Sequence, residues 1–278
     1  MTAQVGTAEN GTPRVGRVRI GLVGAAGRMG QALVEAVTAE PRAALAGGVD
    51  RPGHPLTGQP LTGQGMASGV TLTLGDDAAA LAAVSDVLID FSSPRALAAN
   101  LALGVPLVVG TTGLEAADHA AIDAASQRQA VLQSANMSLG VNLLASLVRQ
   151  AAARLGEDWD IEVLEMHHRH KVDAPSGTAL LLGRAAAEGR GIDLEARSVR
   201  VRDGITGART AGDIGFATLR GGSVPGDHTV IFAADNERLE LSHFAQSRAI
   251  FARGAVAAAL WLAGRPAGRY SMADVLDL

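Results

Sequence analysis

One run of titratable side chains, residues 165–178, holds most of the groups in this sequence that could do chemistry. It reads Glu-Met-His-His-Arg-His-Lys-Val-Asp-Ala-Pro-Ser-Gly-Thr, and three of the chain's seven histidines lie within four positions of it. Lys171 is the only lysine among 24 basic residues, the others being arginine. Lysine, unlike arginine, can release a proton near neutral pH or act as a compact movable charge, so we interpret Lys171 as a chemical residue. The competing interpretation is a lysine retained by chance on a solvated surface.

The same run is strongly cationic in a chain of net charge −4. Five consecutive residues can carry positive charge, and residues 176–178 offer backbone amides at the start of a predicted helix. This combination predicts a site for a small anion, one with carboxylates rather than a polymer. A histidine here could act as general acid or base, and Lys171 could deliver a proton. Asp173 could hold Lys171 or His170 in place.

Two other interpretations of the histidines stay open. His167 or His168, together with His170, could bind zinc, but Arg169 and Lys171 would repel the ion and no clear set of carboxylate ligands is evident beyond Glu165. We therefore expect no metal. Alternatively, the histidines could be structural groups that close the end of a strand.

A glycine-rich turn near the start of the chain predicts dinucleotide binding. The β-type run 18–23 leads into Gly-Ala-Ala-Gly-Arg-Met-Gly at 24–30, and a helical apolar pattern follows. In this context Gly24 permits a tight turn, Gly27 lets the backbone approach a pyrophosphate, and Gly30 allows close packing of helix on strand. The next strand, 43–49, ends in Asp50 and Arg51, which could bind ribose hydroxyls and a 2′-phosphate. A merely polar strand end is the alternative.

Strands and helices then alternate through the first half. We predict strands at 70–74, 86–90, 106–109 and 131–133, with helices after Pro94 and at 116–129. The third and fourth of these strands lead into loops 110–113 and 134–137, at the strand ends where open α/β sheets bind ligands. Residues 18–138 are therefore predicted to form a Rossmann-type dinucleotide-binding domain with a parallel sheet, which makes the fold class α/β.

The pattern changes after residue 138. A long helix leads to strand 161–166, and a helix at 179–187 is predicted to stop at Gly189. β-type segments at 198–201, 214–219, 228–233 and 239–244 follow without helices between them, so residues 139–249 predict a second, α+β domain with a mixed or antiparallel sheet. Residues 250–278 form a C-terminal helix and tail that return to the first domain. The polar residues 1–17 are predicted to be a disordered tail.

Composition narrows the class of protein. Hydrophobic residues are 47% and charged residues 19%, as in ordinary globular chains, while aromatic residues are only 3%. The absence of cysteine excludes disulfides and thiolate chemistry. The negative net charge argues against nucleic-acid binding, and no apolar stretch approaches the roughly 20 residues that cross a membrane. We expect a cytoplasmic enzyme with a small-molecule substrate, no nucleic-acid partner and no membrane partner.

The motif Glu-x-His-His-x-x-Lys-x-Asp-Ala-Pro-Ser-Gly-Thr-Ala, starting at Glu165, resembles that of the 4-hydroxy-tetrahydrodipicolinate (dihydrodipicolinate) reductase family. The resemblance spans residues 18–278 and includes the turn 24–30, Asp90-Phe91, and segments 110–113, 212–218 and 274–278. Members of that family reduce a cyclic dicarboxylate imine with NADPH or NADH, giving tetrahydrodipicolinate in the diaminopimelate–lysine pathway.

The resemblance implies roles for individual residues. His167 would be the general acid/base and Lys171 a proton donor, while His168, Gly177 and Thr178 would contact the substrate carboxylates. The cofactor would be lined by Gly24, Ala25, Ala26, Gly27, Arg28, Met29, Asp50, Arg51, Gly110, Thr111, Thr112, Ser134, Ala135, Asn136 and Met137. The family's nucleotide domain closes over a substrate domain that also forms a tetramer interface, so we expect a homotetramer.

This sequence differs from the family pattern at two of these positions. Asp50 stands where the family often has the longer glutamate, and Met137 where it often has an aromatic residue. Residues 1–17 have no counterpart. Two other functions share the Rossmann half: a dinucleotide-sensing regulator, which would need a basic helix pair that the sequence lacks, and an aspartate or homoserine dehydrogenase, which leaves the 167–171 run unexplained.

Overall fold

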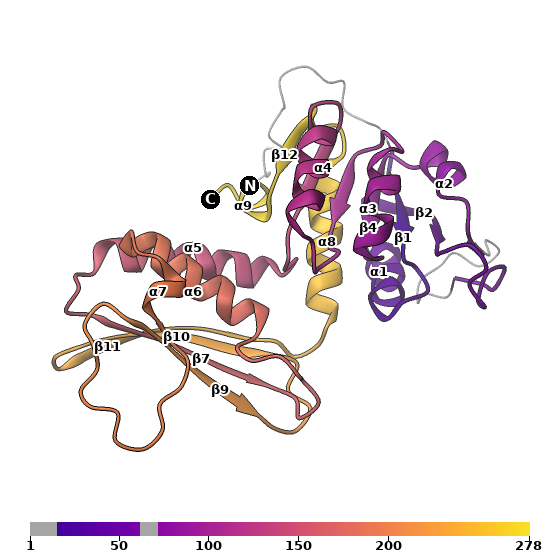
Figure 1. Cartoon of the computed structure of the whole chain (residues 1–278). Helices are drawn as coiled ribbons and strands as arrows, with labels where there is room; N and C mark the ends of the chain where they lie inside the picture. The colour runs from indigo at the N-terminus through magenta and orange to yellow at the C-terminus, as the bar shows by residue number, and fades with distance from the viewer. Residues whose placement is uncertain (1–15, 62–71) are drawn as a thin grey trace, which may run out of the picture.

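Two β-sheets with their own helices make up the part of the chain that the structure describes. The computed structural model describes residues 16–61 and 72–278. Figure 1 shows the sheets side by side, with the long helix α8 (Ala249–Leu262) leading from one to the other. The predicted fold class is confirmed: a parallel Rossmann-type sheet is joined to a second, mixed sheet.

The first sheet has the order β12-β6-β5-β4-β1-β2-β3, and every neighbouring pair in it is parallel. Its strands are short and nearly continuous in apolar residues, as expected for a sheet covered on both faces. They are β1 (Val18–Val23), β2 (Ala43–Val49), β3 (Leu74–Gly75), β4 (Val87–Asp90), β5 (Leu107–Val109), β6 (Ala130–Gln133) and β12 (Gly268–Tyr270).

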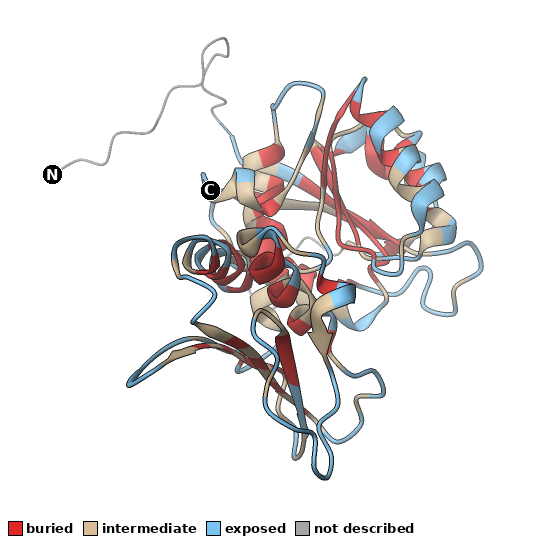
Figure 2. Ribbon diagram, turned by 60° about the vertical axis from the view of Figure 1, so that its left-hand side comes forward, coloured by how far each residue is buried: buried red, intermediate tan, exposed pale blue. Residues whose placement is uncertain are grey.

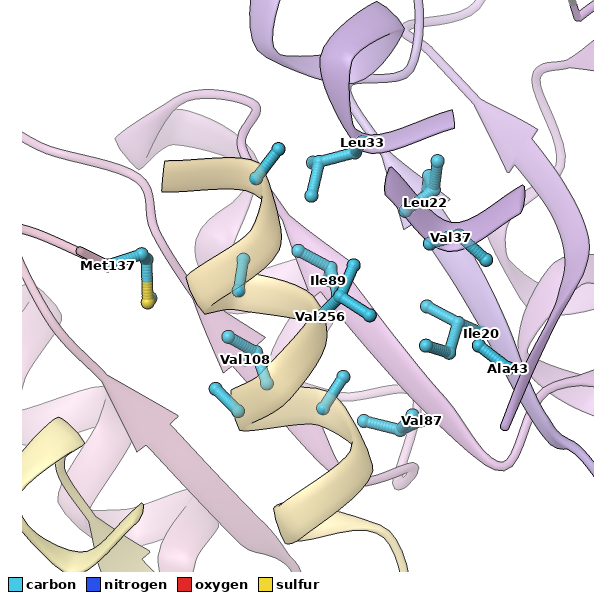
Figure 3. Packing of buried hydrophobic residues seen from close by; sticks show 14 of the residues in the cluster. Ile20, Leu22, Leu33, Val37, Ala43, Val87, Ile89, Val108, Met137 and Val256 are labelled. Atoms are coloured by element: carbon cyan, nitrogen blue, oxygen red, sulfur yellow. The ribbon is translucent and has the colours of Figure 1, made fainter. Parts of the chain in front are cut away.

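Helices cover both faces of this sheet. One face packs against α1 (Arg28–Ala39) and α8, and the other against α2 (Ala78–Val84), α3 (Pro94–Leu101) and α4 (Ala116–Ser126). Figure 3 shows α8 beside the strands, where Val256 lies close to Ile89 and Val108. The C-terminal segment thus returns to the first sheet, because β12 also forms its edge strand, next to β6. The short helix α9 (Met272–Val275) follows β12.

The second sheet has the order β11-β10-β7-β9-β8. β10 runs antiparallel to both of its neighbours, whereas β7, β9 and β8 are parallel. One face packs against α5 and α6 (Figure 1), and burial alternates along β7 and β10 accordingly (Figure 2). The remaining elements are α5 (Leu139–Arg154), β7 (Asp160–His167), α6 (Gly177–Arg190), α7 (Leu194–Arg197), β8 (Ser198–Val199), β9 (Ile214–Arg220), β10 (Asp227–Ala234) and β11 (Glu237–Phe244).

Gly189 does not stop α6, so this prediction was wrong. The helix continues to Arg190, and the left-handed Gly191, at φ +66°, caps it. A Cβ on Gly189 would lie 2.4 Å from the carbonyl oxygen of Arg149 on α5. Gly189 therefore lies where the two helices approach each other closely. In the sequence, a glycine at such a contact cannot be told from a glycine that ends a helix.

Other differences concern short elements. Helices α2 and α7 were not predicted, and the strand predicted at 70–74 is β3 at Leu74–Gly75. Residues 70 and 71, like 1–15 of the predicted tail, lie outside the described residues. No helix within the described residues is long and apolar enough to span a membrane.

Candidate active site

The histidine-rich run lies where β7 ends and the chain turns toward α6. Alternation along β7 directs Glu165 and His167 to the inner face, and both are buried. Beyond the strand, the amides of His168 and Arg169 donate to the carbonyls of Val224 and Gly222, at 2.8 and 3.3 Å. The loop between β9 and β10 therefore holds the run in place along one side.

Glu165 is the centre of a buried polar network at this strand end. Its carboxylate accepts two hydrogen bonds from the Arg220 guanidinium, at 2.8 and 3.0 Å, and one from the Ser176 amide at 3.1 Å. The Nδ1 atom of His167 lies 2.5 Å from its Oε2. Burial alone would raise the pKa of Glu165, but the hydrogen bonds from Arg220 and His167 outweigh it and hold that pKa below its usual value.

His228 lies next to this network on β10. Its ring meets the His167 ring edge-to-face at a centroid distance of 5.1 Å, and its Nε2 lies 3.0 Å from the Ser176 hydroxyl. Burial, with a smaller contribution from the charge of His167, lowers the pKa of His228 to about 4. His228 is therefore neutral at neutral pH, which is a feature that the sequence analysis missed.

Lys171 faces the protein rather than bulk solvent. Its side chain is 20% exposed, and its Nζ lies 2.9 Å from Oδ1 of Asp173. This hydrogen bond is the main reason that the pKa of Asp173 lies below its usual value. Of the two partners expected for Asp173, Lys171 and His170, the structure pairs it with Lys171.

A cationic cavity of about 340 Å³ lies between the start of α1 and the histidine-rich run. Arg28 comes from the first half of the chain, while His168, His170 and Arg248 come from the second. Burial first, and then the positive charges of Arg248 and the neighbouring run, lower the pKa of His168. The arrangement suits an anion, since a negative ligand would relieve this repulsion. Arg248 was missed in the sequence, where it is one of many arginines.

The start of α6 lies close to the loop that follows β6. Ser176 caps the helix by accepting the amide of Ala179 at 3.1 Å. The Thr178 hydroxyl accepts a hydrogen bond from the Asn136 side-chain amide at 3.0 Å. Gly177 is exposed, and a Cβ there would meet no atom within 4 Å. The predicted substrate-binding residues Gly177 and Thr178 thus lie where the two halves of the chain meet.

The glycine turn opens on a second and larger cavity, of about 650 Å³. Gly24 has φ +81°, and a Cβ there would lie 2.6 Å from the Phe91 carbonyl oxygen. The Gly27 amide closes the turn on the Gly24 carbonyl at 3.2 Å, directly before α1. A narrow glycine turn that ends at a helix N-terminus fits the pyrophosphate of a dinucleotide. Gly30 approaches the turn rather than the strand, since its Cβ would lie 2.3 Å from the Ala25 carbonyl oxygen.

Several predicted residues line this cavity and others do not. Gly24, Ala26, Gly27, Asp50 and Arg51 lie on its wall. Missing from the sequence prediction were Phe91, Ser92, Ser93, His54, Asp76 and Asn100. The pair Asp90-Phe91 was a signal for the first of these. The remaining predicted residues on the α1 side are Ala25, which is buried in the turn, and Arg28 and Met29 in the first turn of α1.

Asp50 is fixed at the edge of the cavity by backbone amides. Its Oδ2 accepts the Ala26 amide at 3.2 Å, and its Oδ1 accepts the Arg51 amide at 2.9 Å. The carboxylate thereby ties the end of β2 to the glycine turn. Arg51 itself is exposed.

The loop after β5 is organised by the buried carboxylate of Asp90. Asp90 accepts hydrogen bonds from Ser92, Asn100 and Thr111. The hydroxyl of Thr111 is therefore engaged and buried, whereas Thr112 is exposed. A Cβ on Gly110 would lie 2.2 Å from the Phe91 ring, so Gly110 leaves the space in which that ring lies beside the cavity.

The loop after β6 has a backbone held by its own side chains. The Ser134 hydroxyl donates to the Asn136 carbonyl at 2.7 Å, and Asn136 Oδ1 accepts the Ser138 amide at 2.9 Å. Ala135 lies between them. The Met137 side chain is 2% exposed and belongs to the core beside α8 (Figure 3). Although Met137 was predicted to line the cofactor, its side chain faces the protein interior.

The zinc interpretation has no geometric support within residues 16–61 and 72–278. No group of three or more potential metal ligands is found there. His167 is turned onto Glu165, and the rings of His168 and His170 lie 6.3 Å apart. The Nδ1 of His168 is buried without a hydrogen-bond partner in the described part of the chain.

Comparison with known proteins matches both halves of the chain to one family. Residues 18–137 match the family described as "Dihydrodipicolinate reductase, N-terminus", and residues 140–276 match "Dihydrodipicolinate reductase, C-terminus". The 4-hydroxy-tetrahydrodipicolinate reductase of Afipia carboxidovorans is 55% identical over 94% of this chain and 97% of its own length. That of Zymomonas mobilis is 54% identical over 94% and 98%.

A solved structure shows the same fold. The dipicolinate-bound dihydrodipicolinate reductase of Paenisporosarcina sp. TG-14 superposes with a TM-score of 0.71 at 20% identity, covering 92% of this chain and 97% of its own.

Proposed function

The chain belongs to the dihydrodipicolinate reductase family, and we propose that it reduces its substrate at the cationic cavity between α1 and the 167–171 run. The substrate is the cyclic dicarboxylate imine 4-hydroxy-tetrahydrodipicolinate (dihydrodipicolinate), and the product is tetrahydrodipicolinate, in diaminopimelate and lysine biosynthesis. The observation that carries this location is the cavity itself, because Arg28, His168 and Arg248 surround it from both halves of the chain. Cationic groups on several sides suit a doubly negative ring.

Reduction of the dehydrated ring, dihydrodipicolinate, adds one hydride with its electron pair and one proton. Starting from 4-hydroxy-tetrahydrodipicolinate, the 4-hydroxyl must also leave as water. When bound, NADPH or NADH supplies the hydride. The protein must bind and orient the ring and supply the proton. We assign the proton donor to the Lys171 ammonium, which Asp173 holds, and general acid/base catalysis to His167.

Carboxylate binding is proposed for His168, Gly177 and Thr178. The amides of Gly177 and Thr178 are at the start of α6 and have no partner within the helix, so they suit an anion. The Thr178 hydroxyl already meets Asn136 across the two halves. A ring carboxylate placed there would lie beside the residues that follow β6.

The dinucleotide is proposed to lie along the glycine turn and the larger cavity. Support comes from the conformation of Gly24, from α1 beginning beside Gly27, and from the position of Asp50. The residues proposed to contact the dinucleotide are the cofactor residues that the family resemblance implies. Met137 would contribute through its backbone. Asp50 next to Arg51 supports use of both cofactors, because a carboxylate suits the ribose hydroxyls of NADH and a guanidinium suits the 2′-phosphate of NADPH.

The cofactor proposal is tested by an assay with each dinucleotide in turn. We expect oxidation of both NADPH and NADH, followed by absorbance, with enzymatically generated substrate. Arg51→Ala should weaken NADPH binding by about 10–150-fold and spare NADH, since a charge-assisted hydrogen bond contributes about 1.5–3 kcal/mol. Arg95→Ala, an exposed arginine on α3 outside the cavity wall, is the control. Equal losses for both cofactors would refute the phosphate role, and no oxidation of either would refute the reductase.

We also propose a cytoplasmic homotetramer built through the second sheet. Residues 18–138 would bind the dinucleotide, residues 139–249 would bind substrate and form the interface, and residues 250–278 would rejoin the first domain. The sheet face opposite α5 and α6 supports this, because the strand register puts exposed apolar side chains on it, including Leu219 and Phe244 at 49% and 66% exposure. A second copy of the chain could cover that face.

A further inference from the structure

Glu165 is a buried charge on the inner face of β7, where the two residues before it are apolar. Ile161 and Val163 precede it on that face and are 2% and 1% exposed, and Glu165 itself is 1% exposed. An unpaired carboxylate in such a place would be strongly destabilising. Its carboxylate must therefore be compensated by hydrogen bonds, and the partners that supply them show what it does.

The register of the sheet brings the partners of Glu165 together. β9 runs parallel to β7, with Thr218 opposite Glu165 and Arg220 opposite His167. Arg220 binds the carboxylate with both terminal nitrogens, and the Thr218 hydroxyl donates to it at 3.4 Å. Two strands and the Ser176 amide thus fix both carboxylate oxygens, which leaves Oε2 directed at the His167 ring.

This contact determines which nitrogen of His167 carries the proton. An ionised carboxylate can only accept hydrogen bonds, so at 2.5 Å the Nδ1 of His167 must be the donor. Within residues 16–61 and 72–278, the contact with Glu165 through Nδ1 is the one side-chain hydrogen bond of His167, so the other nitrogen, Nε2, is not engaged. Nε2 is therefore the nitrogen left to exchange a proton with a ligand.

Gly226 keeps that nitrogen uncovered. It lies in the loop before β10, and a Cβ on it would lie 2.9 Å from Nε2 of His167 and 3.4 Å from the His228 ring. A side chain at this position would fill the space in front of Nε2. The carboxylate on one side of the ring and the glycine on the other leave a single reactive edge.

We propose that Glu165, held by Arg220, is a positioning residue that fixes His167 with Nδ1 as donor and presents Nε2 to the substrate. This inference rests on the proposed role of His167 in the reductase. It assigns to Glu165 no contact with substrate or cofactor. Its effect is on the orientation and tautomer of the imidazole alone.

Glu165→Gln tests the proposal by two measurements. With histidine labelled with ¹⁵N, the substrate-free parent should show a strongly downfield Nδ1 proton that disappears in His167→Gln, and Glu165→Gln should shift or lose it. In the assay, kcat should fall on the order of 10²-fold or more, with little change in substrate KM or in cofactor Kd. A folded Glu165→Gln protein with the parent's kcat, or with an unchanged His167 signal, would overturn the proposal.

Glu162→Gln is the matched control. Glu162 lies on the same strand but on the outer face, where Arg202 holds it at 2.7 and 2.8 Å much as Arg220 holds Glu165. It should keep the parent's kcat and histidine spectrum. A loss in Glu162→Gln equal to that in Glu165→Gln would show a general cost of breaking a carboxylate–arginine pair on β7, and would overturn the positioning role.

Gly226→Ala keeps the proposal testable if Glu165→Gln does not fold. It should lower kcat by covering Nε2 while the Nδ1 proton signal persists, and unchanged kcat in the folded variant would contradict the proposal. The spectra are recorded without substrate, so they report on Glu165 even if the parent fails to reduce the imine. An inactive parent with an intact Nδ1 signal would therefore refute the proposed function and not the geometry.

Discussion

Lys171 is the residue whose identity the sequence explains best. A chain that uses arginine at every other basic position keeps one lysine, and the structure pairs that lysine with Asp173 beside the cationic cavity. The guanidinium of an arginine would retain the charge and the ion pair but would not release its proton. The composition and the ion pair with Asp173 both support the proposal that Lys171 donates the proton.

Lys171→Arg should fold and bind cofactor as the parent does, while kcat falls about 10²–10⁴-fold, the usual contribution of a positioned proton donor. Steady-state kinetics with a cofactor-binding titration measure this. The reciprocal exchange Arg169→Lys, at an exposed position in the same run, is the control and should be nearly silent. Wild-type turnover in Lys171→Arg would exclude it as the proton donor.

Individual residues were predictable where the residue type itself indicates the chemistry. His167, His168, Lys171 and the glycines of the turn were found from spacing and from the family motif. Glu165, Arg220 and His228 were not assigned roles, because their meeting depends on the register of β7 with β9 and β10, which sequence spacing does not reveal.

At the scale of elements, the long helices and buried strands are the most predictable part of the chain. Strands β1, β2 and β4 lie close to their predicted bounds, and helix α1 follows the glycine turn as predicted. The short helices α2 and α7 were missed because one or two turns carry too little pattern. Gly189 was misread because a glycine in a helix contact and a glycine at a helix end look alike in sequence.

Gly24→Ala should destabilise the fold and weaken dinucleotide binding. A left-handed alanine costs about 1–2 kcal/mol by itself, and here its Cβ would also lie 2.6 Å from the Phe91 carbonyl oxygen. Gly104→Ala separates the two causes, since Gly104 has φ +70° but open space around it. Denaturant unfolding should show the larger loss in Gly24→Ala, and equal losses would mean that strain alone, without the contact, explains the effect.

At the scale of the whole molecule, the two sheets are joined by few connections, and the candidate site lies along them. Arg28 faces the histidine-rich run, Asn136 meets Thr178, and α8 carries the chain from the second sheet back to the first (Figure 1). Tetramer formation would add contacts on the far face of the second sheet. The sequence predicted the division into two halves, because the pattern changes after residue 138 and the β-type segments from 198 onward follow one another without helices between them.

The buried His228 predicts an acid-sensitive fold. Its pKa is lowered from 6.5 to about 4, so below pH 6.5 the unfolded chain takes up a proton that the folded chain excludes. The free energy of unfolding therefore keeps the full contribution of the neutral His228 above pH 6.5. It loses this contribution progressively as the pH falls toward 4, by up to about 3 kcal/mol in total.

His228→Gln, which can keep a hydrogen bond to Ser176, should therefore show a shallower loss of unfolding free energy between about pH 7 and pH 4 than the parent does. Urea titrations at several pH values measure the slope. His119→Gln, a half-exposed histidine on α4, should leave the slope closer to the parent's. An unchanged slope in His228→Gln would show that this histidine does not limit acid stability.

The central claim is that the hydride comes from a dinucleotide in the larger cavity, while the protein adds only a proton. The most direct test follows one turnover with NADPH deuterated at its transferable position in ordinary water, reading the mass of the product. We expect one deuterium atom in tetrahydrodipicolinate and none when the label is in the other position. A product without deuterium from either labelled cofactor would contradict the account.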